Sequence, residues 1–265
     1  MTTIASHLSI DSRGPCAIYI ASDSRITWGA ASRRWDAGQK TFASSSSPDI
    51  FGYCGSAFFP TQIINQVTGQ VDAGLLFDEM TCADERHGRW VSTIKKSLEN
   101  SVSAAVPDFK LFHGSRTGSG MSCSFRLWEV SFQSDDHVWK DVEVDLQSNR
   151  SHFATVSGSG RDSLQKQLAS TSHQEEAGTS RHAFQALFQT IKAGRDSLSG
   201  GAPQIVGMYR IKSARSFGMI WEGDRYYCGC KLVAGSNFES IEWFNERFER
   251  ADGKTRKRLS GAKQH

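Results

Sequence analysis

The order in which hydrophobic periodicities follow one another is the feature that most restricts the fold of this chain. Alternating apolar and polar positions, typical of half-buried strands, occupy most of the first 54 residues, and they return after residue 108 and after residue 204. The expected strands are 2–10, 16–22, 24–27, 40–43, 50–54, 109–113, 122–132, 138–146, 152–156, 204–210, 216–221 and 226–232.

Apolar residues recur at helical spacing in the segments between these groups of strands. The first such segment follows Ser56, a residue type that can cap a helix N-terminus, and carries Phe58, Ile63 and Val67 on one face. The expected helices are 56–67, 89–104, 161–169, 175–193 and 241–250.

The resulting order is strands, two helices, strands, two helices, strands. Two antiparallel sheets packed face to face, with a helix pair outside each, would bury the inner faces of both sheets. We therefore expect an α+β fold, a four-layer αββα sandwich of two antiparallel sheets flanked by helix pairs. A chain of 265 residues fits one large domain, which we expect over 1–250, with 251–265 as a basic, flexible tail.

Composition excludes several classes of protein. No stretch has the roughly 20 apolar residues of a membrane helix, and the N-terminus lacks the basic region and apolar core of a signal peptide, so we expect a cytoplasmic protein. A net charge of +3 does not indicate a nucleic-acid partner. The only basic concentration begins at Lys254 and is typical of a solvated tail.

The metal-binding residue types show no spacing typical of a metal site. The six cysteines include one close pair, Cys228 and Cys230, with a single residue between them and no second pair nearby. The eight histidines show no paired spacing and are interpreted as surface or core residues. We predict no metal, no cofactor and no catalytic histidine.

The chain begins Met1-Thr2-Thr3, and Thr2 is small enough for methionine aminopeptidase to remove Met1. Removal would leave a hydroxyl and a free α-amine on one residue. The amine, with an ordinary pKa of about 7.7–8.0, is partly neutral near pH 7 and can accept the hydroxyl proton. Asp23 and Lys40 follow at two successive strand ends. By themselves these residues are equally compatible with ordinary surface charges.

Further motifs, in their order along the chain, resemble those of proteasome β-type subunits, a family that includes the bacterial HslV peptidase and related bacterial proteasome homologues. The motifs are Thr2-Thr3-Ile4, Ser22-Asp23-Ser24-Arg25, Lys40, Cys54-Gly55-Ser56-Ala57, Gly158-Ser159-Gly160 and Arg195-Asp196-Ser197-Leu198-Ser199-Gly200-Gly201. Each is common alone, and together they span about residues 2–210. Asp23-Ser24-Arg25 and the motif from Arg195 to Gly201 are more similar to the corresponding motifs of proteasome subunits than to those of HslV.

The resemblance implies a role for each matching residue. Thr2 would be the nucleophile, with its own amine as base, and Lys40 would lie beside it, held charged by Asp23. The Gly55 N–H would stabilise the oxyanion. An alternative for Gly55 is that it only ends a strand, and Lys40 and Asp23 could form a purely structural ion pair.

Ser159, Asp196 and Ser199 resemble the residues that surround the new N-terminus in this family. Ser159 could instead cap the following helix, and Asp196 and Ser199 could simply build a turn. Tyr53 and Ala57 resemble residues that shape the pocket for the substrate side chain before the cut. The bulk of Tyr53 predicts a restrictive pocket and weak or narrow activity on standard peptide reporters.

The resemblance also implies assembly. Members of the family hide their sites inside stacked rings, so we expect a homo-oligomer with six or seven copies per ring, acting on unfolded protein or peptide. The sequence has no Gly-x-x-x-x-Gly-Lys-Ser/Thr loop, so an ATP-dependent unfoldase would be a separate chain.

The function expected on these grounds is a threonine-type endopeptidase of the N-terminal-nucleophile class. The main alternative is a catalytically weak or inactive ring-forming homologue that acts as a scaffold. A third is an amidase with the same nucleophile that acts on a small molecule, which the 196–201 motif supports poorly.

Overall fold

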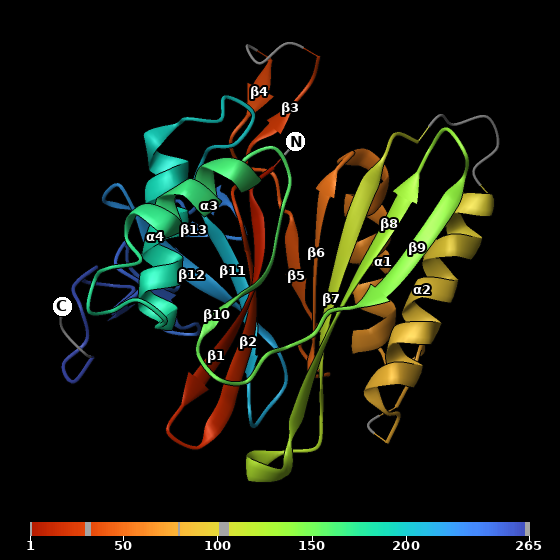
Figure 1. Ribbon diagram of the computed structural model, residues 1–265, viewed down its shortest axis with the longest axis horizontal. Coiled ribbons are helices and arrows are strands. Elements are labelled where there is room, and N and C mark those ends of the chain that lie inside the picture. The colour runs from red at the N-terminus through yellow and green to blue at the C-terminus, as the bar shows by residue number, and fades with distance from the viewer. Residues whose placement is uncertain (1, 30–32, 79, 101–105, 263–265) are drawn as a thin grey trace.

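The computed structural model describes residues 2–29, 33–78, 80–100 and 106–262. These residues form a mixed α and β structure with antiparallel sheets and four α-helices (Figure 1). In the ranges described, no helix has both the length and the apolar character needed to cross a membrane.

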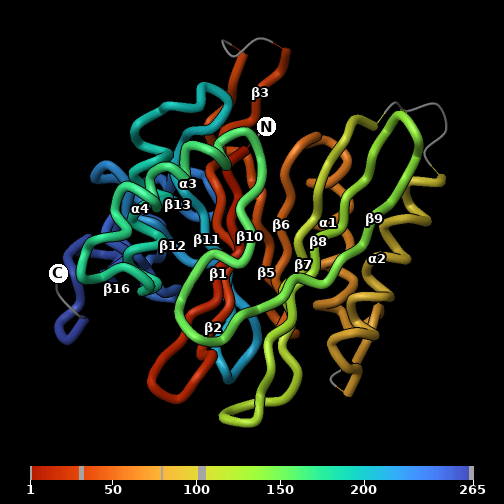
Figure 2. Tube along the Cα trace, in the orientation of Figure 1, coloured from red at the N-terminus to blue at the C-terminus, as the bar shows by residue number. Residues whose placement is uncertain are grey.

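The larger sheet is built around the N-terminal hairpin. Its strand order is β10 (His152–Ser157), β1 (Ile4–Asp11), β2 (Gly14–Ser22), β11 (Gln204–Tyr209), β12 (Arg215–Trp221), β13 (Asp224–Tyr227) and β14 (Cys230–Lys231), with β15 (Trp243–Phe244) pairing β12 and β16 (Arg250–Ala251) pairing β15. Strands β1 and β10 lie side by side although about 150 residues separate them (Figure 2), with Ile4 opposite Ser157. The β12–β15 pair is parallel, which the sequence did not predict.

The second sheet is antiparallel throughout. Its order is β5 (Thr41–Ala43), β6 (Asp49–Gly55), β7 (Phe109–Thr117), β8 (Ser124–Gln133) and β9 (Val138–Glu143). A third, separate pair, β3 (Ile26–Thr27) and β4 (Arg34–Trp35), projects from the upper end of the molecule in Figure 1. This hairpin was expected as a strand followed by a loop.

The helices flank the two sheets in pairs. They are α1 (Phe58–Asp72), α2 (Ala83–Glu99), α3 (Arg161–Ser170) and α4 (Ser180–Ala193). In Figure 1, α3 and α4 lie beside the larger sheet and α1 and α2 beside the five-stranded sheet. Helix α4 begins where the Thr179 hydroxyl accepts the His182 N–H, and it ends at Gly194, whose φ of 60° terminates the helix without steric cost.

Three large apolar clusters connect these elements. One joins the strands of the larger sheet to α3 and α4, through residues such as Leu164 and Phe184. A second joins the five-stranded sheet to α1 and α2, with Trp90 at its centre. The third contains residues of both sheets, among them Ile18 and Phe112, both fully buried, so the two sheets share a common core.

The helix expected at 241–250 is wrong, because the structure has β15 and β16 there. Trp243 and Phe244 are both buried, and their backbones pair with β12 and with β16. Gly218 makes this possible, since a Cβ there would lie 2.4 Å from the Trp243 ring. Pairing with a distant strand therefore overrode the local periodicity.

Several helix boundaries also differ from expectation. The N-cap of α1 is Ala57 rather than Ser56, and it makes no side-chain capping bond. Helix α2 begins at Ala83, before the expected start at 89, and the end of that predicted helix lies among residues that the structure does not describe. Residues 175–179 form turns rather than the first part of α4.

The C-terminal residues that are described pack against the larger sheet. The Leu259 N–H donates to the Arg250 carbonyl, and the Asp252 N–H donates to the Lys257 carbonyl. The Arg225 guanidinium donates to the carbonyls of Gly253 and Lys254. The division into a domain over 1–250 and a tail stays a prediction.

Candidate active site

Thr2 lies just before β1, and its side chain contacts Lys40, the residue that precedes β5. The Lys40 ammonium donates to Thr2 Oγ1 at 2.9 Å and to Asp23 Oδ1 at 2.9 Å. All three residues are almost completely buried, with 1% of Thr2, 1% of Lys40 and none of Asp23 exposed. A hydroxyl, an ammonium and a carboxylate therefore form one connected group.

The Asp23 carboxylate is held by four donors. Besides the Lys40 ammonium, Oδ1 accepts the Thr3 N–H at 3.0 Å. Oδ2 accepts the Arg25 N–H at 3.0 Å and the Gly200 N–H at 2.9 Å. A buried carboxylate needs this number of partners to offset the loss of hydration, and they fix the direction in which it faces Lys40.

Lys40 is a buried cation whose charge depends on Asp23. Burial lowers the pKa of the Lys40 ammonium, and the charge and hydrogen bond of Asp23 oppose that effect. An ammonium in this position stabilises negative charge on Thr2 Oγ1, which is what a threonine nucleophile requires.

A second hydrogen-bond network surrounds the backbone nitrogen of Thr2. The Thr2 N–H donates to Ser159 Oγ at 3.2 Å, and the Ser159 hydroxyl donates to Asp196 Oδ2 at 2.6 Å. The Ser199 hydroxyl also donates to Asp196 Oδ2, at 2.7 Å, and accepts from Thr3 Oγ1 at 2.8 Å. Burial alone would raise the pKa of Asp196, but these hydrogen bonds and the Leu198 N–H hold that pKa below its ordinary value.

Glycines on either side of Ser159 allow this approach. A Cβ on Gly158 would lie 1.9 Å from the Thr2 carbonyl oxygen, and a Cβ on Gly160 would lie 1.8 Å from Thr3 Oγ1. Gly158 also has a φ of +90°, which favours glycine. Gly160, not Ser159, is the N-cap of α3, and no side chain caps that helix. The Ser159 side chain is thus directed to Thr2 and Asp196.

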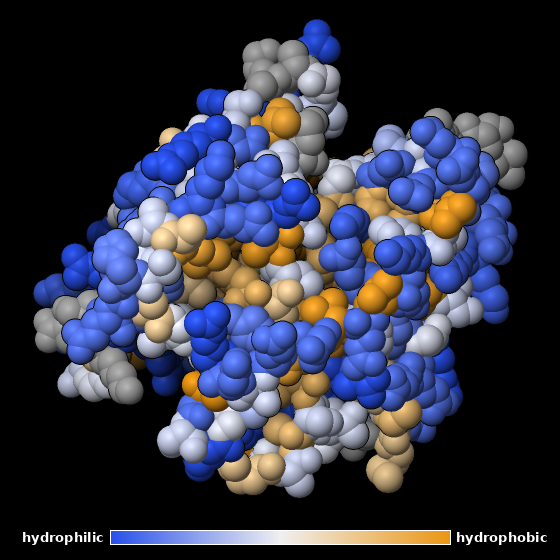
Figure 3. Space-filling view, in the orientation of Figure 1, coloured by the Kyte–Doolittle hydropathy of each residue, from blue (hydrophilic) through white to orange (hydrophobic). Residues whose placement is uncertain are grey.

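Gly55 is the last residue of β6 and is exposed beside Thr2. Its φ is +96°, and a Cβ there would lie 2.6 Å from the Asp108 carbonyl oxygen, so the position requires glycine. Gly55 and Thr2 line one cavity of about 770 Å³ together with Lys40, Tyr53 and Ala57. Figure 3 shows the surface hollowed between the β3–β4 hairpin and the upper end of the five-stranded sheet.

Tyr53 forms part of the wall of this cavity and is only 1% exposed. Its hydroxyl donates to the Gln39 carbonyl at 3.2 Å and accepts from Thr61 Oγ1 at 2.6 Å. Burial raises the pKa of the phenol to about 12, so it is neutral at physiological pH. The ring packs in the apolar cluster between the five-stranded sheet and α1. Packing of the ring and hydrogen bonds to the hydroxyl therefore hold the side chain in place.

The structure thus brings every residue of the predicted site around Thr2. Lys40, Gly55, Tyr53 and Ala57 face the cavity. Asp23 bonds Lys40, and Ser159 bonds the Thr2 backbone nitrogen. Asp196 and Ser199 are connected to Thr2 indirectly, because Asp196 accepts the Ser159 and Ser199 hydroxyls.

One residue that the sequence did not single out has a central position. Gln204, the first residue of β11, is 1% exposed and forms five hydrogen bonds. Its Oε1 accepts the Lys40 N–H at 2.9 Å, as well as the N–H and hydroxyl of Thr41. Its Nε2 donates to the carbonyls of Asp23 at 3.0 Å and Gly38 at 2.9 Å. An amide at the start of an otherwise apolar strand was the available sequence signal.

Arg25 was quoted only as part of a motif, but it supports the same region. Its guanidinium binds Asp36 through two bonds of 2.7 and 2.8 Å and donates to the carbonyls of Ser197 and Ser199. Because the Ser199 hydroxyl bonds Asp196, Arg25 links the start of the β3–β4 hairpin to the network around the Thr2 nitrogen.

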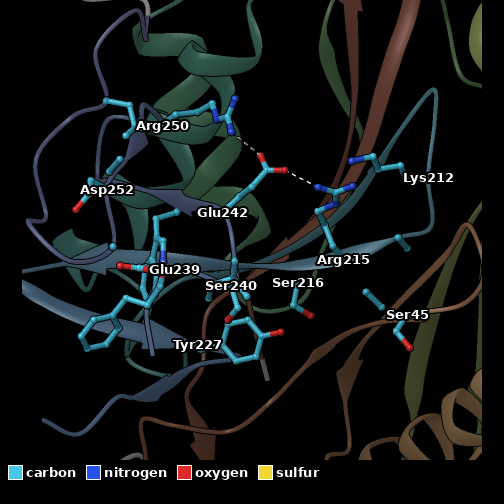
Figure 4. A pocket seen from close by; sticks show the side chains of 18 of the residues that line it. Ser45, Lys212, Arg215, Ser216, Tyr227, Glu239, Ser240, Glu242, Arg250 and Asp252 are labelled. Atoms are coloured by element: carbon cyan, nitrogen blue, oxygen red, sulfur yellow. Dashed lines mark hydrogen bonds and ion pairs between the residues drawn. The ribbon is translucent and has the colours of Figure 1, made fainter. Parts of the chain in front are cut away.

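A cavity of about 780 Å³ lies elsewhere, between β12, β15 and the segment after β5, and contains none of the predicted site residues (Figure 4). In Figure 4 the Glu242 carboxylate lies between the guanidinium groups of Arg215 and Arg250, and it pairs with both. Among the residues that the structure describes, no cluster of three His, Cys, Asp or Glu side chains is placed to hold a metal ion.

No protein-family model and no curated protein matches this sequence. Solved structures do match, among them Thiobacillus denitrificans BPH in complex with epoxomicin, with a TM-score of 0.47 and 14% sequence identity over 79% of this chain and 99% of that chain. A structural similarity this low does not indicate what chemistry this chain performs.

Proposed function

We propose that the chain is a threonine-type endopeptidase of the N-terminal-nucleophile class, with Thr2 as nucleophile after removal of Met1. The observation that carries this proposal is the Lys40 ammonium, which lies 2.9 Å from Thr2 Oγ1 and 2.9 Å from the Asp23 carboxylate. Burying an ammonium costs free energy of desolvation, so a buried lysine beside a hydroxyl at a cavity is a candidate for a chemical role, and polarising that hydroxyl is such a role.

The first half of the reaction makes an acyl-enzyme. The free amine of Thr2, directly or through a water molecule, takes the proton of Oγ1, and Oγ1 attacks the peptide carbonyl carbon. The carbonyl oxygen becomes an oxyanion that the Gly55 N–H stabilises. As the peptide C–N bond breaks, the protonated amine of Thr2 gives its proton to the leaving nitrogen, and an ester to Oγ1 remains.

The second half returns the enzyme to its starting state. A water molecule gives a proton to the Thr2 amine and attacks the ester carbon, and Oγ1 leaves and recovers the proton. Lys40 donates no proton in this scheme; its positive charge favours both the neutral amine and the developing alkoxide. Ser159, Asp196 and Ser199 orient the amine.

The proposal also covers the arrangement of layers in the fold, the location of the protein and its assembly. We infer a four-layer αββα arrangement of the N-terminal-nucleophile hydrolases, and cytoplasmic stacked rings of six or seven identical chains fed with unfolded protein by a separate ATP-dependent unfoldase.

The test is covalent labelling. The purified protein is treated with a peptide epoxyketone or boronate, and intact mass and peptide mapping locate the adduct. We expect a chain that has lost Met1 and is labelled on Thr2, with labelling abolished in Thr2→Ala and reduced at least a hundredfold in Lys40→Ala. Lys192→Ala, which removes a half-exposed lysine paired with Glu246, is the matched control and should label normally.

Retention of Met1 by protein from its native host, with no adduct, would support the scaffold alternative. In that case the chain's α-amine would be one residue away from the hydroxyl, and no base would be present on Thr2 itself.

A further inference from the structure

The charges that line the Thr2 cavity do not balance. Four charged side chains belong to its lining: Arg25, Lys40, Asp108 and Asp135. Each cation is paired with a carboxylate that does not line the cavity. Arg25 binds Asp36 at 2.7 and 2.8 Å, and Lys40 binds Asp23 at 2.9 Å. The positive charges are therefore already compensated before a substrate enters.

The two carboxylates have no such compensation. Asp108 accepts the N–H and the hydroxyl of Ser134, at 2.8 and 2.7 Å, and these neutral donors lower the pKa of its carboxyl. Within the described residues, neither Asp108 nor Asp135 forms an ion pair. Arg33 and Arg34 belong to the same hairpin region but do not line the cavity. At neutral pH the side chains that line the cavity therefore carry two uncompensated negative charges, and a protonated Thr2 amine would offset only one of them.

The remaining lining is largely apolar. It includes the indole of Trp28, the ring of Tyr53 and the side chains of Ala57, Phe58 and Pro107. Trp28 is 54% exposed and presents part of its ring to solvent. A side chain that starts at Thr2 and ends near Asp108 and Asp135 needs an apolar stem and a cationic tip. Lysine and arginine have this construction, and an exposed indole adds attraction for a cation.

We propose that this cavity selects peptides with lysine or arginine at the position before the cut, so that the acyl group transferred to Thr2 carries a basic side chain. This inference depends on the proposed function and specifies its substrate. Neutral side chains of the same length gain only the apolar contacts, and acidic side chains are repelled. The apolar wall supplied by Tyr53 then serves as support for a long stem.

The experiment compares two substrates that differ only in charge. Two otherwise identical peptides with an aminocoumarin leaving group carry arginine or its neutral isostere citrulline before the cut. We expect kcat/KM to favour arginine about five- to tenfold, the combined effect of two exposed carboxylates on one cation. Raising the salt concentration from about 0.05 to 0.5 M should reduce the ratio, because exposed charges are screened.

Variants assign the preference to the two carboxylates. Asp108→Asn/Asp135→Asn should bring the arginine-to-citrulline ratio close to one, and Asp135→Asn alone, at an exposed side chain, should lower it in part. Asp136→Asn removes the adjacent carboxylate, which does not line the cavity, and should leave the ratio unchanged. Epoxyketone labelling of Thr2 in each variant checks that the site is intact.

The outcomes separate this inference from the proposed function. If Thr2 is labelled but citrulline or leucine is cleaved as well as arginine, or if the ratio survives in the double variant, the inference is wrong and the peptidase stands. If no peptide is cleaved and no probe labels Thr2, both are wrong.

Discussion

The substitution Gln204→Glu tests how the ion pair at the site is held in place. The amide nitrogen of Gln204 donates to the carbonyls of Asp23 and Gly38, while its oxygen accepts the Lys40 and Thr41 N–H groups. Glutamate has nearly the same shape, but an ionised carboxylate would direct an oxygen at two carbonyl oxygens. In the folded variant the carboxyl must therefore keep its proton, and its pKa must rise.

The size of the effect follows from linkage. An unfolded glutamate has a pKa of about 4.3, and complete burial raises a carboxyl pKa by about 3–5 units. A carboxyl whose pKa is raised on folding does not reduce the free energy of unfolding below its unfolded pKa. Above that pH the free energy of unfolding falls by about 1.4 kcal/mol per pH unit, until the folded pKa is reached. Relative to wild type, the variant should lose about 1 kcal/mol at pH 5 and about 3–4 kcal/mol at pH 7.

The assay is urea denaturation of both proteins between pH 5 and 7.5, with Thr2 labelling measured in parallel. Labelling by the variant should recover toward wild type as the pH falls. Gln39→Glu is the matched control, because Gln39 is half-buried and its amide makes one hydrogen bond, to the Thr41 carbonyl. A stability difference for Gln204→Glu that does not change with pH, or that equals the Gln39→Glu difference, would refute the reasoning.

Four further substitutions test other features. Burial lowers the pKa of His7 to about 3, and neither ring nitrogen has a hydrogen-bond partner among the described residues. Because folding disfavours the charged ring, the contribution of His7 to stability is complete above pH 6.5 and falls by about 4–5 kcal/mol as the pH drops to 3. Denaturation measured across this pH range should therefore show a shallower fall in stability for His7→Phe than for wild type. Gly160→Ala would place a Cβ 1.8 Å from Thr3 Oγ1, so it should lower the free energy of unfolding by about 1–3 kcal/mol in urea denaturation and slow Thr2 labelling. Gly69→Ala, inside α1 with open space at its Cβ, should raise the free energy of unfolding by up to about 1 kcal/mol in the same assay. Tyr53→Ala should widen the range of side chains accepted before the cut, measured with a peptide library; an unchanged preference would show that Tyr53 does not shape the pocket.

The strand and helix order could be predicted because periodicity depends on which face of each element is buried. Helix α4 follows such a pattern closely, whereas β1 and β2 are buried at six successive positions each, so both of their faces are covered and only their apolar character indicated them. The segment around Trp243 could not be predicted in the same way. Its conformation depends on Gly218, which lies under the indole on a strand that is not adjacent in sequence, and no local pattern contains that information.

The grouping around Thr2 could be predicted only through motif order. Asp23 directly follows β2 and Lys40 directly precedes β5, so both are at strand ends, but periodicity does not indicate that these ends meet. Gln204 was missed for a related reason. An amide has no charge or motif to distinguish it. Its importance lies in joining β11 to Asp23 and to the 38–41 segment, which come together only in the folded chain.

The Gly200 N–H completes the set of donors to Asp23, and Gln204 joins Asp23 to Lys40. Both lie about three quarters of the way along the chain, so under the proposed function an emerging chain would carry the Thr2 hydroxyl through most of translation without the groups that activate it. Peptide-bond cleavage would then have to wait until most of the chain has been synthesised and β11 has joined β2.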